Sequence, residues 1–328
     1  MSAEIHIGTQ GWNYDAWVGP FYPTGTRPSD FLTVYARAFD SVEVDSTFYA
    51  SPATTTIRSW LDRTPKEFVF ALKMPQEITH EHRLRDETGA SEAFFDRARE
   101  LGDKLGPVLV QMGPDFQPGE LPALVDFIGR TPSDLRIAIE FRHRGWITDG
   151  VLALLSEHNI ALALIDGRWI PRKLMLGLTE RPTADFAYIR WMGPNRDLVD
   201  YSRVQVDRSR EVDAWSDAIE SLSEKVSHIY GYVANHFSGH SPATAREFQS
   251  RLGQAPVDPD LLGEDTLLDR VTNHLITADR LTIESNGDRH ERVKPEFIFP
   301  FFHLSQSSGP KVVATTTILR GVACSIKY

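Results

Sequence analysis

Residues 67–112, EFVFALKMPQEITHEHRLRDETGASEAFFDRARELGDKLGPVLVQM, decide the fold because they contain a strand, a helix and a second strand. The two ends of this stretch, Glu67–Lys73 and Pro107–Met112, are short apolar runs typical of buried strands. Between them, apolar residues recur at steps of four, three and four, which predicts one face of a helix. These residues are Phe94, Ala98, Leu101 and Leu105. Strands joined by such a crossover are expected to pair in parallel.

The same order of strand and helix repeats up to about residue 262. Strands are predicted at Ile5–Thr9, Ser41–Ser46, Glu67–Lys73, Pro107–Met112, Leu135–Phe141, Ile160–Ile165, Phe186–Trp191 and His228–Ala234. Helical spacing is also found at Val151–Leu155, at Pro171–Leu178 and from Val212 to Val226. Eight parallel strands with helices between them predict an α/β fold, a TIM-type (β/α)8 barrel. An open doubly wound sheet is the alternative, but its glycine-rich turn, G-x-G-x-x-G, is not found in the chain.

Residues 263–328 break this order and are predicted to be a C-terminal extension of the barrel domain, residues 1–262. The spacing of Leu267, Leu268, Val271 and Leu275 predicts one more amphipathic helix, and Phe297–Phe302 is an apolar cluster. Two alternatives stay open for this extension. Either it docks on the barrel through the apolar cluster, or it is partly disordered.

The composition is that of a globular chain with a sizeable core: 328 residues, 41% hydrophobic and 24% charged. The single cysteine, Cys324, excludes a disulfide framework and a cysteine zinc site. We expect a soluble, cytoplasmic protein, because neither a signal peptide nor a run long enough to span a membrane is apparent. The net charge of −10 argues against a nonspecific coat on nucleic acid and leaves room for a local basic pocket.

Charged and amide side chains collect at the carboxyl ends of the predicted strands. They are Glu43, Asp45, Lys73, Gln111, Glu140, Arg142, Asp166 and Arg190. In a parallel barrel these ends open on one face, the mouth, where barrel enzymes carry their chemistry. Alternation along the third strand puts Val69, Ala71 and Lys73 on one face and three bulky residues on the other, which suits the helix layer. Lys73 is therefore expected to point into the mouth.

These side chains have two interpretations. In the first, an ion-pair network closes the top of the barrel without a ligand, because buried charges have to be paired. In the second, the mouth is a site for an anionic substrate. Glu43 and Glu140 are then the acid and base candidates, and Asp166 is a third catalytic candidate with an orienting role. The predicted substrate-binding residues are Lys73, Gln111, Arg142 and Arg190, with the two arginines and the lysine holding the anion.

Four residues in loops are further candidates for substrate binding. Trp12 and Tyr49 follow the first two strands and are predicted either to stack on a ring of the ligand or to pack within the loops. Asn235 and Ser241 follow the last strand. Ser241 is predicted to cap a helix that runs to about Leu252, and this helix start either binds a phosphate or is a plain cap. Basic residues in several loops on the same face favour the anion: Arg83, Arg85, Arg144, Arg168, Arg172, Lys173 and Arg196.

Short motifs from Ile5 to about Leu262 resemble those of the domain of unknown function 72 family, which is also called YecE-like. The motifs are Ile7-Gly8-Thr9, Gly11-Trp12-Asn13-Tyr14, Val42-Glu43-Val44-Asp45-Ser46-Thr47-Phe48-Tyr49, Phe70-Ala71-Leu72-Lys73, Val110-Gln111, Glu140-Phe141-Arg142, Tyr188-Ile189-Arg190 and Asn235-His236. The resemblance implies a barrel related in shape to endonuclease IV and xylose isomerase, and it implies no established reaction. Asp45, Met192 and Ala234 depart from the family pattern, which usually has asparagine, histidine and asparagine at these positions.

Three functions stay open for this chain. It is an enzyme acting on a phosphate-bearing or otherwise anionic small molecule or a nucleic-acid end, a barrel that binds a ligand without turnover, or a metal-dependent hydrolase shaped like endonuclease IV. The histidine pairs His80 with His82 and His236 with His240 match no metal motif, so we expect neither a metal site nor a cofactor. No membrane and no particular protein partner is indicated. Two carboxylates facing one cavity favour catalysis, whereas carboxylates locked in arginine pairs favour the binding module.

Overall fold

The computed structural model describes residues 3–85, 88–194 and 197–263 and has one sheet of parallel strands. The strands are β1 (Glu4–Gln10), β2 (Ser41–Val44), β3 (Val69–Lys73), β4 (Leu105–Gln111), β5 (Ile137–Glu140), β6 (Ala161–Leu162), β7 (Leu164–Gly167), β8 (Phe186–Gly193) and β9 (His228–Val233). Their order in the sheet is β6-β5-β4-β3-β2-β1-β9-β8-β7. The two ends of this order, β6 and β7, are consecutive in the chain.

The sheet therefore curls into a nearly closed barrel, and the predicted fold is confirmed. The sixth predicted strand is split at Ala163 into two short strands. β6 pairs with β5, whereas β7 pairs with β8, and the Ala163 amide still donates to the Ile139 carbonyl at 2.9 Å. One predicted strand thus pairs with both neighbouring strands, β5 through its first half and β8 through its second half. The barrel therefore has nine strands where eight were predicted.

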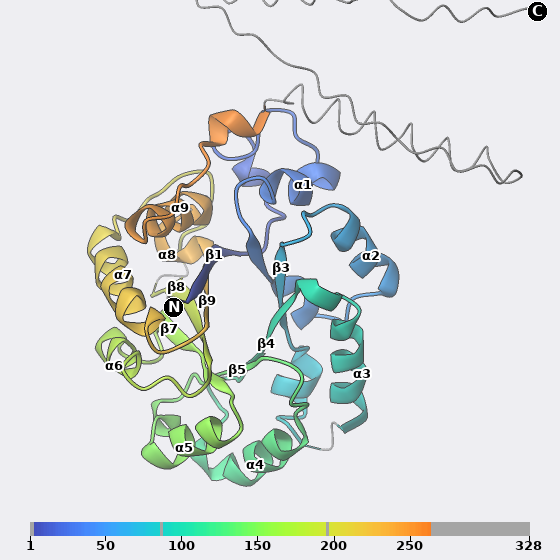
Figure 1. Ribbon diagram of the computed structural model, residues 1–328, viewed down its shortest axis with the longest axis vertical. Helices are drawn as coiled ribbons and strands as arrows, with labels where there is room; N and C mark the ends of the chain where they lie inside the picture. Colours follow the sequence, from blue (N-terminus) through green and yellow to red (C-terminus); the bar gives the residue numbers. More distant parts are fainter. Residues whose placement is uncertain (1–2, 86–87, 195–196, 264–328) are drawn as a thin grey trace, which may run out of the picture. The chain divides into compact units, whose positions relative to one another are not determined.

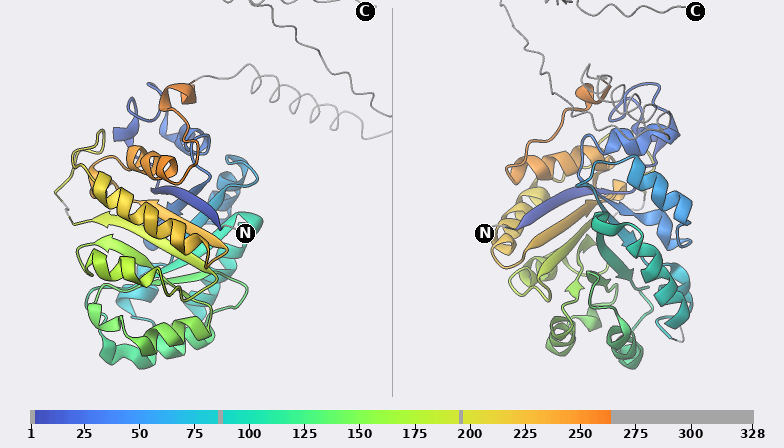
Figure 2. Two further views of the ribbon diagram at one scale, coloured as in Figure 1. Left: turned by 60° about the vertical axis from the view of Figure 1, so that its left-hand side comes forward. Right: turned by 45° about the vertical axis from the view of Figure 1, so that its right-hand side comes forward.

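Helices follow the strands and lie around the outside of the barrel (Figure 1, Figure 2). They are α1 (Phe31–Tyr35), α2 (Thr54–Asp62), α3 (Thr88–Arg99), α4 (Leu121–Arg130), α5 (Asp149–Glu157), α6 (Arg172–Leu178), α7 (Ser209–Ser223), α8 (Asn235–Ser238) and α9 (Ser241–Arg251). The predicted face of α7 is buried, including Val212, Trp215 and Ile219. The predicted helix face of Phe94, Ala98, Leu101 and Leu105 is wrong at its end. α3 ends at Arg99, so Leu101 lies beyond the helix, and Leu105 begins β4.

The interior of the barrel is filled by large side chains from one half and small ones from the other. Phe186, Tyr188, Tyr230 and Tyr232 project from β8 and β9, and they pack with Ala71, Ala138, Ala161 and Ala163. Large and small inward side chains thus complement one another across the barrel and form a buried cluster inside it. Glycine is required at Gly8 of β1, because a Cβ there would lie 2.1 Å from the Ser41 carbonyl oxygen of β2.

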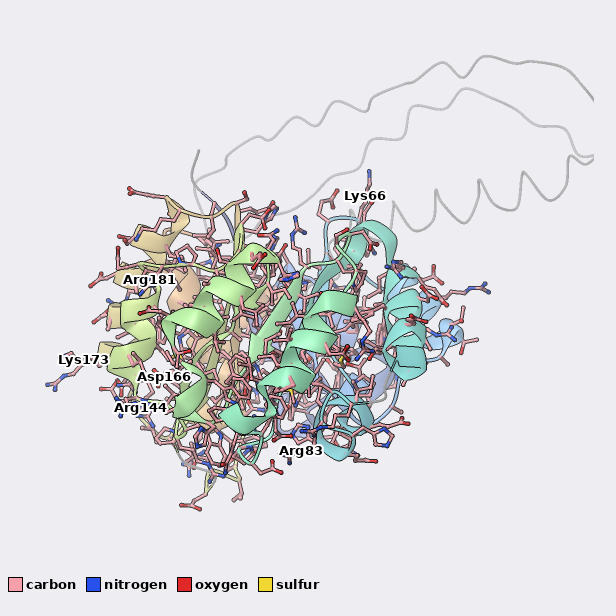
Figure 3. All side chains as sticks on the ribbon, turned by 90° about the horizontal axis from the view of Figure 1, so that it is seen from below. Lys66, Arg83, Arg144, Asp166, Lys173 and Arg181 are labelled. Carbon is pink, nitrogen blue, oxygen red and sulfur yellow. The ribbon has the colours of Figure 1, made fainter. Side chains whose placement is uncertain are left out.

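All strands run in one direction, so every loop that leaves a carboxyl end lies on one face. Figure 3 shows this polarity: Lys66 precedes β3 and Arg83 follows it, and the two lie at opposite ends of the molecule. No helix among the described residues is long and apolar enough to cross a membrane. The predicted extension lies outside the described residues from position 264 onward, and this includes its predicted helix and Phe297–Phe302.

Candidate functional site

A cavity of about 260 Å³ opens in the mouth of the barrel. We call it the mouth cavity, and its lining residues are Gln10, Tyr14, Asp45, Phe48, Tyr49, Lys73, Gln111, Arg142, Arg190, Met192, Tyr201, Ala234, Asn235 and His236. They come from the ends of β1, β3, β4 and β8 and from the loops and short helices that follow the strands. A site in this position has its walls fixed by the barrel and its chemistry supplied by loops.

Arg190 of β8 forms the floor of the mouth cavity and is 1% exposed. Its Nε donates to Glu43 Oε2 at 2.8 Å, and its Nη2 donates to Glu43 Oε1 at 2.6 Å. Its Nη1 donates to Oε2 of Glu140 on β5, and Asp45 lies 3.8 Å from Nη2. A bidentate guanidinium pair of this kind is among the strongest hydrogen-bonding arrangements in proteins. We call Arg190, Glu43, Glu140, Arg142 and Gln111 the Arg190 network.

The second half of the Arg190 network links Glu140 to the loop after β3. Arg142 donates from Nε to Glu140 Oε1 at 2.9 Å and from Nη2 to Gln111 Oε1 at 2.8 Å. Gln111 Nε2 then lies 3.3 Å from the Nε2 atom of His80. Arg142 is 13% exposed and reaches the mouth cavity, whereas Glu140 is fully buried behind it.

Glu43 and Glu140 share one guanidinium, and their pKa values are driven apart. Burial and the charge of Asp45 raise the pKa of Glu43 to about 7, against the opposing effect of Arg190. Burial would also raise the pKa of Glu140, but Arg190 and Arg142 outweigh it and lower this pKa to about 2. Tyr188 donates a further hydrogen bond to Glu43 at 2.7 Å. Two neighbouring carboxyl groups with different pKa values are found both in structural ion-pair networks and in acid-base catalytic sites. The positions of the two glutamates relative to the cavity have to decide between these roles.

Lys73 is the cavity-lining cation that stands apart from these pairs. Its side chain leaves the end of β3 in the predicted direction and is 8% exposed. The Nζ atom lies 3.8 Å from the centroid of the Phe48 ring, a cation–π distance. Among the described residues, no carboxylate lies within 4 Å of Nζ and no acceptor is hydrogen-bonded to it. Burial and Arg190 lower the pKa of Lys73, while Asp45 and the two glutamates oppose this effect.

Aromatic side chains form one wall of the mouth cavity. Tyr49 is 75% exposed and packs edge-on against Phe48 at 5.5 Å between ring centroids. Tyr14 hydrogen-bonds the Gln10 carbonyl at 3.1 Å, and its pKa is raised, chiefly by burial and then by Asp45. Trp12, the other predicted stacking residue, instead packs edge-on against Trp60. The structure therefore brings Tyr49 to the cavity and leaves Trp12 in the loop packing.

Asp166 is not brought into the mouth cavity. Its Oδ2 accepts from Arg172 Nε at 2.5 Å and from the Trp215 indole at 2.8 Å. Both partners belong to the helix layer, in α6 and α7, so Asp166 faces outward from the barrel. Figure 3 shows it on the same side as Lys173, the neighbour of Arg172 in α6. Asp166 therefore ties two helices to β7 instead of reaching a ligand at the mouth.

The helix start after β9 also differs from the prediction. Ser241 is the first residue of α9 and not its cap, and it is fully buried. Its amide donates to Asn235 Oδ1 at 3.0 Å and its hydroxyl donates to the same oxygen at 2.8 Å. The predicted phosphate site therefore has no free Ser241 donor. Asn235 does line the mouth cavity, and its Oδ1 is also bonded by the Trp17 indole at 3.2 Å.

The predicted histidine pairs are engaged with protein groups. His80 Nδ1 lies 2.9 Å from the Thr79 hydroxyl, and His240 Nδ1 lies 2.7 Å from the Tyr201 carbonyl oxygen. His236 Nε2 lies 3.2 Å from the Tyr201 hydroxyl. The described part of the chain contains no group of three or more His, Cys, Asp and Glu side chains arranged to hold a metal ion.

Several basic residues of the mouth loops are already paired. Arg83 binds Asp115 and Glu120, and Arg85 binds Glu120 at 2.7 Å. Arg196 lies outside the described residues. These paired loop arginines contribute little free positive charge to the mouth. The attraction of the mouth cavity for an anion therefore depends more on Lys73.

Seven lining residues were not named as site residues from sequence: Gln10, Tyr14, Phe48, Met192, Tyr201, Ala234 and His236. Tyr14 and Phe48 stand in the motifs Gly11-Trp12-Asn13-Tyr14 and Ser46-Thr47-Phe48-Tyr49, so the signal for them was available. Gln10 and Met192 continue the inward alternation of β1 and β8 by one step. Tyr201 lies in a long loop between β8 and α7, where no periodic pattern could place it.

A family model described as "Protein of unknown function DUF72" matches residues 6–265. The UPF0759 protein YecE of Escherichia coli K12 is 31% identical over 146 residues, 44% of this chain and 51% of that protein. The UPF0759 protein YunF of Bacillus subtilis is 30% identical over 152 residues, 44% of this chain and 52% of that protein. The chain thus spans about half the length of the curated relatives it matches.

Two solved structures share the fold. A DUF72 family protein of Thermotoga maritima is 25% identical, with a TM-score of 0.65, and the match covers 76% of this chain and 100% of that one. A DUF72 family protein of Enterococcus faecalis is 20% identical, with a TM-score of 0.60, over 77% of this chain and 99% of that one. At 20% identity, the similarity to the Enterococcus faecalis protein shows a shared fold and no more.

Proposed function

The chain belongs to the DUF72 family, and we propose that it binds a small anionic molecule, carrying a phosphate or carboxylate group, in the mouth cavity. The observation that carries this proposal is Lys73. It is a nearly buried cation that opens on a cavity and has no carboxylate within 4 Å among the described residues. A buried charge without a partner is costly, and an anionic ligand supplies the missing partner.

The charge of the site supports an anion. The mouth holds three cationic side chains, Lys73, Arg142 and Arg190, and three acidic ones, Glu43, Asp45 and Glu140. Because the pKa of Glu43 is raised to about 7, this residue carries less than a full negative charge near neutral pH. With Glu43 protonated, Asp45 and Glu140 remain against the three cationic groups, and Lys73 and Arg142 line the cavity. The pKa of Lys73 is lowered, which opposes this balance, and an anion bound beside Nζ would favour the protonated amine.

Binding is favoured over catalysis by the two glutamates. Glu43 and Glu140 are both fully buried and locked to arginines, and neither lines the mouth cavity. Glu140 borders only a smaller neighbouring cavity of about 50 Å³ among those described. An acid or base must come within hydrogen-bond reach of the proton that it transfers. We therefore assign the glutamates to the scaffold that holds Arg190 and Arg142 in place.

The size of the cavity supports a small ligand. Its volume of about 260 Å³ is below the range of pockets that enclose drug-sized molecules. Tyr49, Phe48 and Tyr14 provide an aromatic wall for the uncharged part of such a molecule. We propose the cytoplasm as the location of the protein, in keeping with its single cysteine in 328 residues.

Isothermal titration with sulfate and with inorganic phosphate tests this function. We expect binding by the unaltered protein, and at least roughly tenfold weaker binding by Lys73→Met, since a tenfold change in affinity is about 1.4 kcal/mol. The matched control is Lys173→Met, which removes an exposed lysine from α6 and is expected to bind as the unaltered protein does. Equal affinity of all three proteins for sulfate would contradict the proposal.

A further inference from the structure

We propose that the anion bound in the mouth cavity also carries an aldehyde or ketone group, and that the amine of Lys73 condenses with this carbonyl to form an imine. This inference rests on the proposed function and names the chemical class of its ligand: a small 2-oxo acid or a small aldehyde phosphate. Its basis is the contrast between Lys73 and the other described lysines.

The Nζ atom of Lys73 is available to a ligand, whereas two other described lysines are engaged. Lys104 Nζ donates to the Leu61 carbonyl at 2.8 Å and to both oxygens of Thr64, at 2.8 and 2.9 Å. Lys225 Nζ lies 2.5 Å from a Glu180 oxygen. Lys73 instead has its Nζ beside the Phe48 ring and opens on the cavity. A lysine so placed combines low solvation with access for a small molecule.

The surroundings of Lys73 shift its equilibrium toward the neutral amine, which is the form that attacks a carbonyl. Burial and the neighbouring guanidinium of Arg190 lower its pKa, against Asp45, Glu43 and Glu140. Desolvation and a nearby cation are the two known means by which proteins activate a lysine as a nucleophile. Asp45 is 36% exposed and lines the same cavity, so one carboxylate faces the space that the ligand would enter.

The condensation is balanced by the loss of one water molecule. The lone pair of Nζ forms a bond to the carbonyl carbon, and the carbonyl oxygen takes up a proton. This hydroxyl then leaves as water with a second proton while the carbon–nitrogen double bond forms. No electron is gained or lost, so no oxidant or reductant takes part.

Arg142 is the second anchor of the proposed ligand. Its Nε and Nη2 bind Glu140 and Gln111, and among the described residues its Nη1 has no hydrogen-bond partner. A carboxylate or phosphate held at Nη1 would keep the ligand in the cavity while its carbonyl lies toward Lys73. Holding two reacting groups together in this way accelerates a condensation that is slow in dilute solution.

Reductive trapping tests the inference on the full chain. The protein is incubated at about pH 7 with limiting pyruvate and sodium cyanoborohydride, which reduces an imine to a stable secondary amine. Peptide mapping by mass spectrometry is expected to find the adduct on Lys73 at roughly tenfold or higher occupancy than on exposed Lys66, exposed Lys173 or engaged Lys104. Lys73→Arg is expected to abolish the main adduct, and Lys173→Arg is expected to leave it. Excess sulfate is expected to protect Lys73.

The outcomes separate this inference from the proposed function. Sulfate binding by titration together with preferential labelling of Lys73 supports both. If sulfate binding depends on Lys73 but Lys73 is labelled no more than Lys66, the imine is excluded and the proposed function stands. If sulfate does not bind and labelling is spread over the exposed lysines, both are overturned.

Discussion

Arg190 and Glu43 form a bidentate pair in the floor of the mouth, with Nε to Oε2 at 2.8 Å and Nη2 to Oε1 at 2.6 Å. The same guanidinium binds Glu140, so one cation stabilises two buried carboxylates. Removing a single member of such a group leaves a buried charge uncompensated. The Arg190–Glu43 pair is therefore expected to stabilise the folded barrel as well as to shape the floor of the mouth cavity.

Replacing Arg190 is expected to destabilise the protein strongly. Arg190→Met keeps an unbranched side chain but removes the guanidinium, and it leaves Glu43 without its two hydrogen bonds from Arg190. We expect the free energy of unfolding in urea to fall by roughly 3–5 kcal/mol. The control is Arg181→Met, whose partner Asp149 is 86% exposed, and the expected change there is within about 1 kcal/mol. A loss for Arg190→Met as small as that of the control would contradict the structural role of the pair.

Glu43 is expected to make the free energy of unfolding decrease as the pH rises. Its pKa is raised to about 7, so the stability it contributes is present at acid pH and is lost as the pH rises through about 7. Between about pH 5 and pH 8, the unaltered protein should lose on the order of 2–3 kcal/mol relative to Glu43→Gln. Urea unfolding at both pH values measures this difference.

Glu140 is the control for that experiment, because its pKa is shifted in the opposite direction to that of Glu43. Its pKa is lowered to about 2, so its contribution is present above the ordinary carboxyl range and is lost only in strong acid. Glu140→Gln should therefore differ from the unaltered protein by the same amount at pH 5 and pH 8. Parallel pH profiles of Glu43→Gln and the unaltered protein would show that Glu43 keeps an ordinary pKa.

Anion binding is expected to weaken as the pH rises through about 7. Ionisation of Glu43, whose pKa is raised to about 7, adds a negative charge beneath the cavity and weakens its attraction for an anion. Sulfate is the suitable probe, because its own charge is constant in this range. Titrations from about pH 6 to pH 8 should show the affinity falling, with a smaller fall for Glu43→Gln. An affinity that rises with pH would rule out this coupling.

The strand pattern was sufficient to predict the barrel from sequence, because inward alternation and helical spacing are local signals. The split at Ala163 was not predictable, since it depends on the strand pairing with two different neighbours. Alternation also placed Lys73 and Arg142 correctly at the cavity. The prediction that Asp166 reaches the mouth is wrong, because alternation along the strand directs its side chain toward the helix layer. Asp166 lies two residues from Leu164, on the outer face with Leu162.

In the loops, the sequence was compatible with two arrangements, and tertiary packing decides between them. Trp12 packs edge-on against Trp60, whereas Tyr49 is 75% exposed and lines the mouth cavity. Ser241 had the composition of a helix cap, but Asn235 accepts both its amide and its hydroxyl, a contact six residues apart in a tight turn. Such hydrogen-bond partners are determined by tertiary packing, and the spacing of residues along the sequence does not predict them.

We propose that residues 1–262 fold without the remainder of the chain. β1 to α9 all lie within this range, and buried Leu262 accepts a hydrogen bond from Arg37 through its carbonyl at 3.1 Å. A chain cut after Leu262 is expected to unfold in one cooperative urea transition. A chain cut after residue 258, which lacks Leu262, is expected to be less stable. Aggregation of the longer fragment would show that residues beyond Leu262 cover surface that the barrel needs buried.

A crystal structure of the protein soaked in sulfate tests the central claim most directly. We expect one sulfate in the mouth cavity, within hydrogen-bond distance of Lys73 Nζ and with Arg142 Nη1 as a second donor. The ion should be absent from crystals of Lys73→Met treated in the same way. A mouth cavity that contains only water, while sulfate occupies exposed arginines such as Arg144, would contradict the claim that this cavity binds an anion.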